Sequence, residues 1–229
     1  MVRLARVVLS HVPHHVTQRG NGRARTFFGD ADYRLYRDLL VDHGRQHGVG
    51  IWGWCLMPNH VHLILTPSDK DGLRAVLSRV HRQYAGHVHA RERRTGHFWQ
   101  GRFGCVAMDE AHLVAAMAYV VLNPLRARLV EKAQDWAWSS IHAYLRPDKG
   151  DGVTDVEALT PYLVAAKQII AAGEEDDRFE ALRRSETIGR PIGNDAFLRW
   201  VEEQVGRTLK PGKRGPKPHR RGGGDGQWN

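Results

Sequence analysis

The chain contains two histidines, His60 and His62, whose type and spacing suggest metal chemistry. They lie in an apolar, β-prone run over residues 56–65, with the turn residues Pro58 and Asn59 near its start. Alternate side chains of a β-strand point to the same face, so both imidazoles would share one face and could bind one metal ion. A His-x-His pair alone is more often two ordinary strand histidines, so this interpretation depends on the rest of the chain.

A second group of candidate residues lies on the helix expected over residues 109–123, which Asp109 can cap and Pro124 is expected to end. The apolar stripe of this helix consists of Leu113, Ala116, Met117, Val120 and Val121. Tyr119 lies off that stripe beside alanines, which predicts open space above it, and Asn123 follows four residues later on the same line. A tyrosine hydroxyl can act as a nucleophile when a metal ion or a base activates it. The alternative is a half-buried packing residue, which is the commoner role of a helical tyrosine.

Periodic patterns predict the elements that must position these side chains. Strands are expected over residues 7–18, 49–57, 60–65 and 103–108, and helices over 30–47, from 71 past 89, and over 109–123. The short Pro58-Asn59 connection predicts an antiparallel hairpin, with Val61, Leu63 and Leu65 pointing away from the histidines into a core. Asp30 is the candidate N-cap of the first helix.

Two other segments carry residue types found in functional sites. His87 and His89 form a second His-x-His pair, but on a helix residues two apart point about 200° from each other, so these two cannot share one ion. In the segment 96–103, glycines, aromatic residues and a cation are interleaved. Trp99 or Phe98 could stack on nucleic-acid bases, or the aromatic rings could anchor the loop to the core. Both interpretations stay open.

The charge of the chain favours polyanionic partners. The formal net charge is +9 and the isoelectric point is about 9.9, and the 24 residues from Gly206 onward hold +6 of that charge. A second basic concentration consists of Arg79, Arg82, Arg91, Arg93, Arg94 and Arg102. Such a concentration predicts a surface that follows a phosphate backbone.

The composition also bears on the cellular compartment. No run of about 18 apolar residues is present, so no membrane span is expected. The first ten residues lack an apolar segment with a cleavage site, and two cysteines are too few for a disulfide framework. We therefore expect a cytoplasmic protein without membrane contact, associated with the nucleoid when bound to DNA.

Changes in composition predict three parts. Residues 1–145 form the main domain, and residues 146–210 form a helical C-terminal extension. The extension begins with a linker over 146–152 and continues with helical patterns near 155–172, 175–187 and 194–205. Residues 211–229, rich in proline, glycine, lysine and arginine, are expected to be a disordered basic tail.

Five ordered motifs carry a resemblance to a known family. They are Pro13-His-His-Val-Thr-Gln-Arg-Gly-Asn21, Met57-Pro-Asn-His-Val-His62, Gly96-His-Phe-Trp-Gln-Gly-Arg-Phe103, Tyr119-x-x-x-Asn-Pro-x-Arg-Ala127 and Trp138-Ser-Ser140. Together they resemble the single-tyrosine HUH transposases, and most of all the REP-associated tyrosine transposases of bacteria. The resemblance is dense over residues 1–145. Several ordered motifs are far more specific than any one of them.

This resemblance implies an α+β fold with a central antiparallel β-sheet flanked by helices, of the ferredoxin-like or RRM-like HUH type. It implies that Tyr119 is the catalytic nucleophile and that His60, His62 and Asn123 bind Mg²⁺ or Mn²⁺. The insertion-sequence branch of the family often has glutamine at the third ligand position, so the shorter Asn123 is a departure. The implied activity is metal-dependent cleavage and rejoining of single-stranded, hairpin-containing DNA through a covalent 5′-phosphotyrosine intermediate.

The expected partner is single-stranded DNA with hairpins or palindromic repeats, bound by a monomer or a homodimer. The residues expected to contact this DNA are Arg19, Asn21, Arg79, Arg82, Trp99, Arg102, Lys213 and Arg214. One alternative is a domesticated sequence-specific DNA-binding protein with the same fold and no strand transfer. Another is an unrelated metal phosphoesterase, which would not need the tyrosine.

Overall fold

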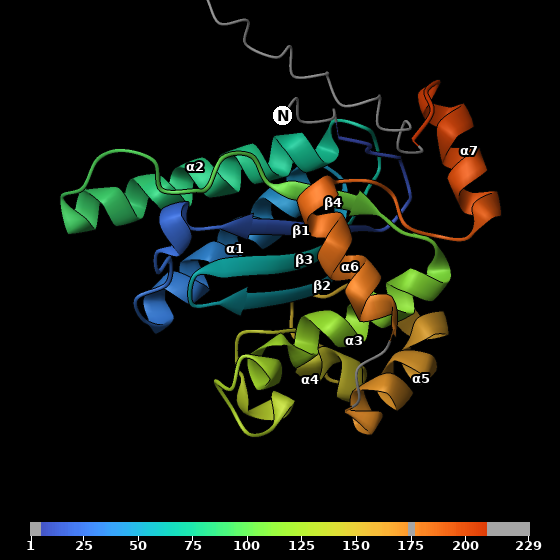
Figure 1. Cartoon of the computed structure of the whole chain (residues 1–229). Helices are drawn as coiled ribbons and strands as arrows, with labels where there is room; N and C mark the ends of the chain where they lie inside the picture. Colours follow the sequence, from blue (N-terminus) through green and yellow to red (C-terminus); the bar gives the residue numbers. More distant parts are fainter. Residues whose placement is uncertain (1–5, 174–176, 210–229) are drawn as a thin grey trace, which may run out of the picture.

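A four-stranded antiparallel sheet lies at the centre of the molecule (Figure 1). The computed structural model describes residues 6–173 and 177–209. The strands are β1 (His14–Arg19), β2 (Val49–Met57), β3 (His60–Pro67) and β4 (Gly104–Ala107), in the spatial order β2-β3-β1-β4. With one helix after β1 and another after β3, this order is the ferredoxin-like topology. The predicted fold class is therefore confirmed.

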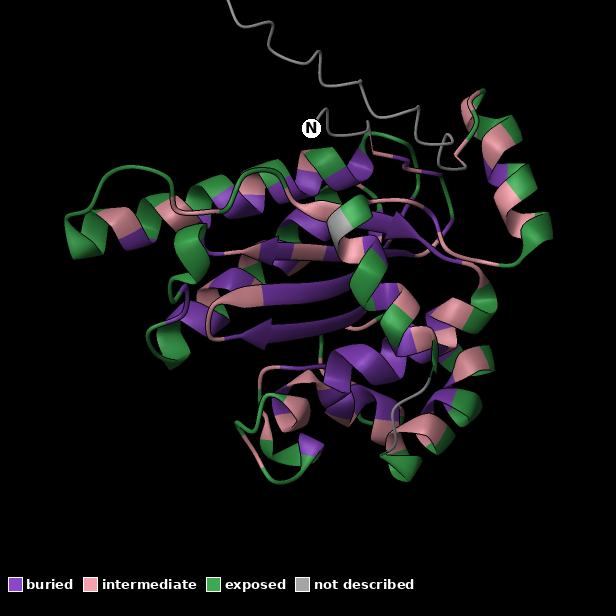
Figure 2. Ribbon diagram, in the orientation of Figure 1, coloured by how far each residue is buried: buried purple, intermediate pink, exposed green. Residues whose placement is uncertain are grey.

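Helices cover both faces of this sheet (Figure 1). Helices α1 (Asp30–Gln46) and α2 (Gly72–Glu92) pack on one face. Helix α3 (Glu110–Arg126) packs on the other. The strands and α3 are largely buried, whereas the outer sides of α2 and of the later helices are exposed (Figure 2).

In the described part of the chain, four helices follow α3; two of them pack against α3, and the last packs beside the β4 end of the sheet. They are α4 (Ile141–Leu145), α5 (Val156–Ala172), α6 (Asp177–Ile188) and α7 (Asp195–Val205), and two short 3-10 turns lie at Asn21–Arg23 and Ala133–Asp135. From α5 and α6, Leu159, Phe179 and Leu182 enter the same apolar cluster as Met117 and Val120 of α3. The extension therefore shares a core with the sheet domain. The division at residue 145 stays a prediction, and the predicted basic tail lies outside the described residues.

Strand alternation distributes the residues of β3 as predicted. Val61, Leu63 and Leu65 join the apolar cluster that contains residues of α1 and α2. Ile64 instead joins the cluster around α3. The face that carries Ile64 also carries His60 and His62, so both imidazoles lie on the α3 side.

Three local predictions were wrong. The first strand begins at His14 rather than at residue 7, because the preceding residues leave the sheet and Val7 and Leu9 pack with α7. Helix α1 is preceded by Gly29 rather than capped by Asp30, and the Asp32 carboxylate instead accepts from the Phe28 amide at 2.8 Å.

The third concerns Pro124, which does not end α3. The helix continues to Arg126 although Pro124 has no N–H to donate, because the hydrogen bonds of the following residues still form. The Ala127 amide donates to the Asn123 carbonyl at 2.8 Å.

The β2 edge of the sheet is covered by a segment from far along the chain. The Leu56 amide donates to the Trp138 carbonyl, and the Ser140 amide donates to the Trp54 carbonyl, each at 2.9 Å. The predicted hairpin between β2 and β3 is present, with Met57 paired to His60 across the Pro58-Asn59 turn. Among the described residues, no helix combines the length and apolar character needed to cross a bilayer.

Candidate active site

The candidate site lies on the α3 side of the two central strands. Thr17 of β1 pairs with His62 of β3, and Arg19 pairs with His60. Directly paired residues project from the same face of a sheet, so His15, two residues before Thr17, also points towards α3. Strand register thus brings three histidines together from two strands.

The three imidazoles are in contact. His15 Nε2 and His62 Nδ1 lie 3.0 Å apart, and their rings stack with centroids 5.2 Å apart. The His60 ring centroid lies 4.9 Å from that of His62, and His60 Nδ1 lies 2.6 Å from Asn59 Oδ1. The Asn59 oxygen can only accept, so His60 carries its proton on Nδ1 and has a free electron pair on Nε2.

Burial keeps these imidazoles neutral. It lowers the pKa of His60 to about 4 and that of His15 to about 3, and it also holds the pKa of His62 well below its ordinary value. The nearby cation Arg19 lowers the pKa of His60 further. A neutral imidazole is the form that binds a metal ion.

Tyr119 projects from α3 against the same histidines. Its ring meets the His62 ring edge to face at 5.6 Å and the His15 ring at 5.8 Å. The prediction of open space above it was wrong, since the residue is only 4% exposed. Helix α6 covers it, with the Phe179 ring centroid 5.5 Å away. The alanines of α3 do leave room beside the tyrosine, but residues more than 50 positions later fill that room.

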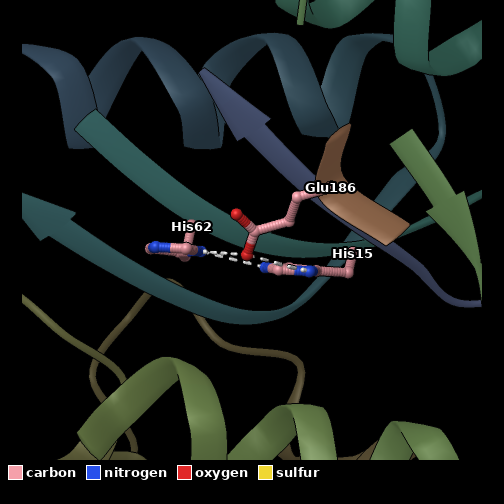
Figure 3. A group of neighbouring side chains, drawn as sticks. All are labelled: His15, His62 and Glu186. Atoms are coloured by element: carbon pink, nitrogen blue, oxygen red, sulfur yellow. Dashed lines mark hydrogen bonds and ion pairs between the residues drawn. The ribbon is translucent and has the colours of Figure 1, made fainter. Parts of the chain in front are cut away.

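Glu186 of α6 completes the cluster (Figure 3). The Tyr119 hydroxyl donates to Glu186 Oε1 at 3.2 Å. The same oxygen lies 3.7 Å from His62 Nδ1 and 4.0 Å from His15 Nδ1. Burial raises the pKa of Glu186 to about 7. His15, His62 and Glu186 form a group whose nitrogen and oxygen atoms lie within 4.8 Å of one another and could hold a metal ion.

Sequence reasoning did not select His15 or Glu186. His15 was visible as part of the motif over residues 13–21, but nothing local indicated that it would contact His62. Glu186 is one of several charged residues in an amphipathic helical pattern. No sequence signal marks it, because its role depends on how α6 packs on α3.

Asn123, the predicted third ligand, is half-buried on α3 one turn after Tyr119. Its side-chain nitrogen donates to the Tyr119 carbonyl at 2.9 Å. This bond uses the amide nitrogen, so the oxygen is the atom that could serve a metal ion. Its role as a ligand stays a prediction.

A pocket of about 290 Å³ opens beside the histidines. His60, His62 and Glu186 form one part of its wall. Arg6, Arg19 and Arg102 supply cations to its lining, and we call it the arginine pocket. Three arginines and one carboxylate line this pocket, so its lining carries net positive charge and suits an anionic ligand.

The other predicted DNA contacts lie elsewhere. Arg79 and Arg82 belong to α2, on the opposite side of the sheet, and Asn21 is exposed in the loop after β1. Trp99 is half-buried, and its indole nitrogen donates to the His81 carbonyl at 3.0 Å. This bond supports the loop-anchoring interpretation, and base stacking stays a prediction. Lys213 and Arg214 lie outside the described residues.

The fold and the cluster of histidines around one tyrosine are consistent with a DNA-processing enzyme. Comparison with known families identifies the family. The family model described as "Transposase IS200 like" matches residues 8–123. The chain belongs to this family.

Two relatives and one solved structure are similar to this chain. A REP-associated tyrosine transposase of Escherichia coli K12 is 27% identical over 115 residues, which is 48% of this chain and 65% of that protein. A Haemophilus influenzae protein described in the same terms is 25% identical over 118 residues, 45% of this chain and 67% of its own length. A REP-associated tyrosine transposase bound to a REP hairpin superposes with a TM-score of 0.57 at 19% identity, covering 67% of this chain and 90% of that one. This last likeness shows the shared fold.

Proposed function

We propose that the protein is a metal-dependent transposase that cleaves and rejoins single-stranded, hairpin-containing DNA through a covalent 5′-phosphotyrosine at Tyr119. The observation that carries the proposal is the contact of the Tyr119 ring with His62 at 5.6 Å, beside a pocket lined by three arginines. Membership of the IS200-like transposase family supports it. The nearest alternative is a protein that binds the same DNA without cutting it.

His60 and His62 are the residues proposed to hold a divalent ion, with the Asn123 oxygen as third ligand. The donor set fits, because both imidazoles are neutral and His60 has its Nε2 electron pair free. His62 Nδ1 forms a hydrogen bond with His15 Nε2. When His62 donates the proton of this bond, the Nε2 atom of His62 keeps the free electron pair that could bind a metal ion. Mixed nitrogen and oxygen ligands suit Mn²⁺ or Mg²⁺. A bound ion would polarise the scissile phosphate.

Each residue of the site would then have its own role in the reaction. The Tyr119 hydroxyl releases its proton to solvent, and its oxygen attacks the phosphorus. The bond to the 3′-oxygen breaks, and that oxygen takes up a proton, which leaves a 3′-hydroxyl and a 5′-phosphotyrosine. Rejoining reverses these steps. Arg6, Arg19 and Arg102 would bind neighbouring phosphates in the arginine pocket.

Without a bound metal ion, Tyr119 is poorly reactive. Burial and the neighbouring Glu186 carboxylate raise the pKa of Tyr119 above its ordinary value. Arg126 lies over the Tyr119 ring, 5.0 Å from its centroid, but does not offset this rise. Attack at neutral pH therefore needs a further positive charge near the hydroxyl, which a metal ion held by His60 and His62 would supply.

The test is an end-label experiment with a hairpin-containing single strand and Mn²⁺. A label at the 3′ end of the DNA should migrate with the protein on a denaturing gel, because the downstream fragment carries the 5′-phosphotyrosine. A label at the 5′ end should leave as a shorter free strand with a 3′-hydroxyl. Chelation of the metal should remove both products. Binding of the hairpin without either product would favour the DNA-binding alternative.

A further inference from the structure

One oxygen atom connects the candidate nucleophile with the histidine cluster. Glu186 Oε1 accepts from the Tyr119 hydroxyl at 3.2 Å. The same oxygen lies 3.7 Å from His62 Nδ1 (Figure 3). Glu186 comes more than 60 residues after position 123, where the match to the family model ends. The carboxylate therefore reaches the site from the C-terminal extension.

The backbone around Glu186 holds the carboxylate in place. On α6, Phe179 and Leu182 are 1% and 0% exposed in the core beside α3, and Ser185 is 4% exposed. At the end of the helix, the Gly189 amide donates to the Ser185 carbonyl at 2.6 Å. The Glu186 side chain is 20% exposed and lines the arginine pocket. Glu186 is thus fixed by buried neighbours, unlike Glu180 on the same helix, whose side chain is 63% exposed.

The Glu186 carboxylate gives the buried Tyr119 hydroxyl a hydrogen-bond acceptor, and a buried phenol that has one acceptor is restricted in where its hydroxyl can point. Without an acceptor at this position, the Tyr119 ring could still pack against Phe179 and His62, but nothing would fix the direction of its hydroxyl. A misplacement of about 1 Å can reduce a rate about 100-fold. Orientation of the nucleophile is therefore a function that this contact can perform.

We infer that Glu186 is a positioning residue that holds the Tyr119 hydroxyl beside His62, so that the C-terminal extension supplies part of the active site. This inference rests on the proposed function. It assigns α6 a part in the chemistry in addition to its packing on α3.

The first measurement does not depend on activity. In the full-length protein labelled with 3-fluorotyrosine, the Tyr119 fluorine resonance is identified by its loss in Tyr119→Phe. Glu186→Ala should shift and broaden that resonance, whereas the matched control Glu180→Ala should leave it unchanged. A resonance that Glu186→Ala does not move would overturn the inference.

The second measurement is single-turnover cleavage of hairpin DNA at saturating DNA and Mn²⁺. Glu186→Ala should slow cleavage about 10- to 100-fold while the Kd for DNA and the melting temperature stay close to wild type. Glu186→Gln should restore the rate to within about fivefold, because its amide oxygen accepts the same hydrogen bond. A glutamine variant as slow as the alanine variant, or an alanine variant as fast as wild type, would contradict the inference.

Together, the two measurements distinguish a failure of the proposed function from a failure of the positioning role of Glu186. If wild-type protein forms no adduct but its fluorine resonance responds to Glu186→Ala, the proposed function fails and the positioning contact remains. If wild-type protein forms the adduct and the resonance does not respond, the proposed function stands and Glu186 has no positioning role.

Discussion

The two faces of the sheet each carry a tyrosine beside a histidine, yet the two pairs differ in their surroundings. On the α1/α2 face, the Tyr36 hydroxyl lies 3.0 Å from His81 Nε2, and Tyr36 is fully buried. The His81 carbonyl accepts from Trp99, so this cluster is closed by its own hydrogen bonds. On the α3 face, His62 meets Tyr119, and both His60 and His62 line the arginine pocket.

The difference shows that residue type alone does not distinguish a functional site from a cluster that only stabilises the core. Both pairs combine an imidazole of lowered pKa with a phenol of raised pKa, and burial is the first cause in each. The α3-side pair lies beside the arginine pocket, and its neighbour His15 has a buried Nδ1 that lacks a hydrogen-bond partner among the described residues. Access and unused hydrogen-bonding capacity indicate function here.

The largest difference between the faces should appear when each tyrosine loses its hydroxyl. Tyr119→Phe should abolish the covalent DNA adduct, a loss of at least about 1,000-fold, because no nucleophilic oxygen remains. Tyr36→Phe should keep the adduct but lower the free energy of unfolding by about 1–2 kcal/mol, since it leaves His81 without its partner. Denaturing gels and urea unfolding measure the two effects. Adduct formation by Tyr119→Phe would show that another residue is the nucleophile.

The second-largest difference between the faces should appear in the Mn²⁺ affinity of histidine variants. His60→Ala and His62→Ala should each weaken Mn²⁺ binding at least about 10-fold, because each removes one proposed ligand. His81→Ala should leave Mn²⁺ affinity unchanged and lower the melting temperature, because its partner Tyr36 is buried. Titration calorimetry compares the three variants. Equal losses of Mn²⁺ affinity in all three would remove the distinction between the faces.

A smaller effect concerns acid stability. Burial lowers the pKa of His81 from 6.5 to about 3, so the unfolded chain binds a proton more readily than the folded one. The stability contributed by neutral His81 is complete above pH 6.5 and is lost as the pH falls from 6.5 towards about 3. Between pH 7 and pH 5 the loss should be about 2 kcal/mol. Urea unfolding across this range should show a shallower pH dependence for His81→Gln, and an unchanged slope would mean that folding does not shift the pKa of His81.

The smallest effect should distinguish arginines on the two faces. Arg102→Ala should reduce the slope of log affinity against log salt by roughly 0.7 on single-stranded DNA, the value for one lost phosphate contact. Arg82→Ala on α2 should leave the slope unchanged if DNA enters on the α3 side. Binding isotherms at several salt concentrations provide the slopes. A reduced slope only for Arg82→Ala would assign DNA to the α1/α2 side, as the predicted contact at Arg82 would require.

Much of the fold could be predicted from local patterns. The pattern near 155–172 became α5 (Val156–Ala172), and that near 194–205 became α7 (Asp195–Val205), because caps and apolar periodicity are local properties. The shared face of His60 and His62 followed from strand alternation. The strand order was implied only by the family resemblance.

The remaining features of the site depend on packing between distant segments. Tyr119 was expected to be open, but a helix almost 60 residues later covers it. Glu186 carries no periodic or motif signal, and His15 gains its importance from strand register. These contacts join residues that are 67 and 47 positions apart, respectively, so no local pattern contains them.

The cover over the β2 edge has a consequence for synthesis on the ribosome. Residues 1–126 contain all four strands and α3, but Trp138 and Ser140, which bond to the backbone of β2, are made later. A nascent chain that has emerged only through α3 therefore presents an unpaired strand edge, the kind of surface through which chains aggregate. Translation speed while residues 127–140 are still inside the ribosome should accordingly influence the yield of native protein, because slow translation at that stage increases the time for which neighbouring nascent chains can pair through β2.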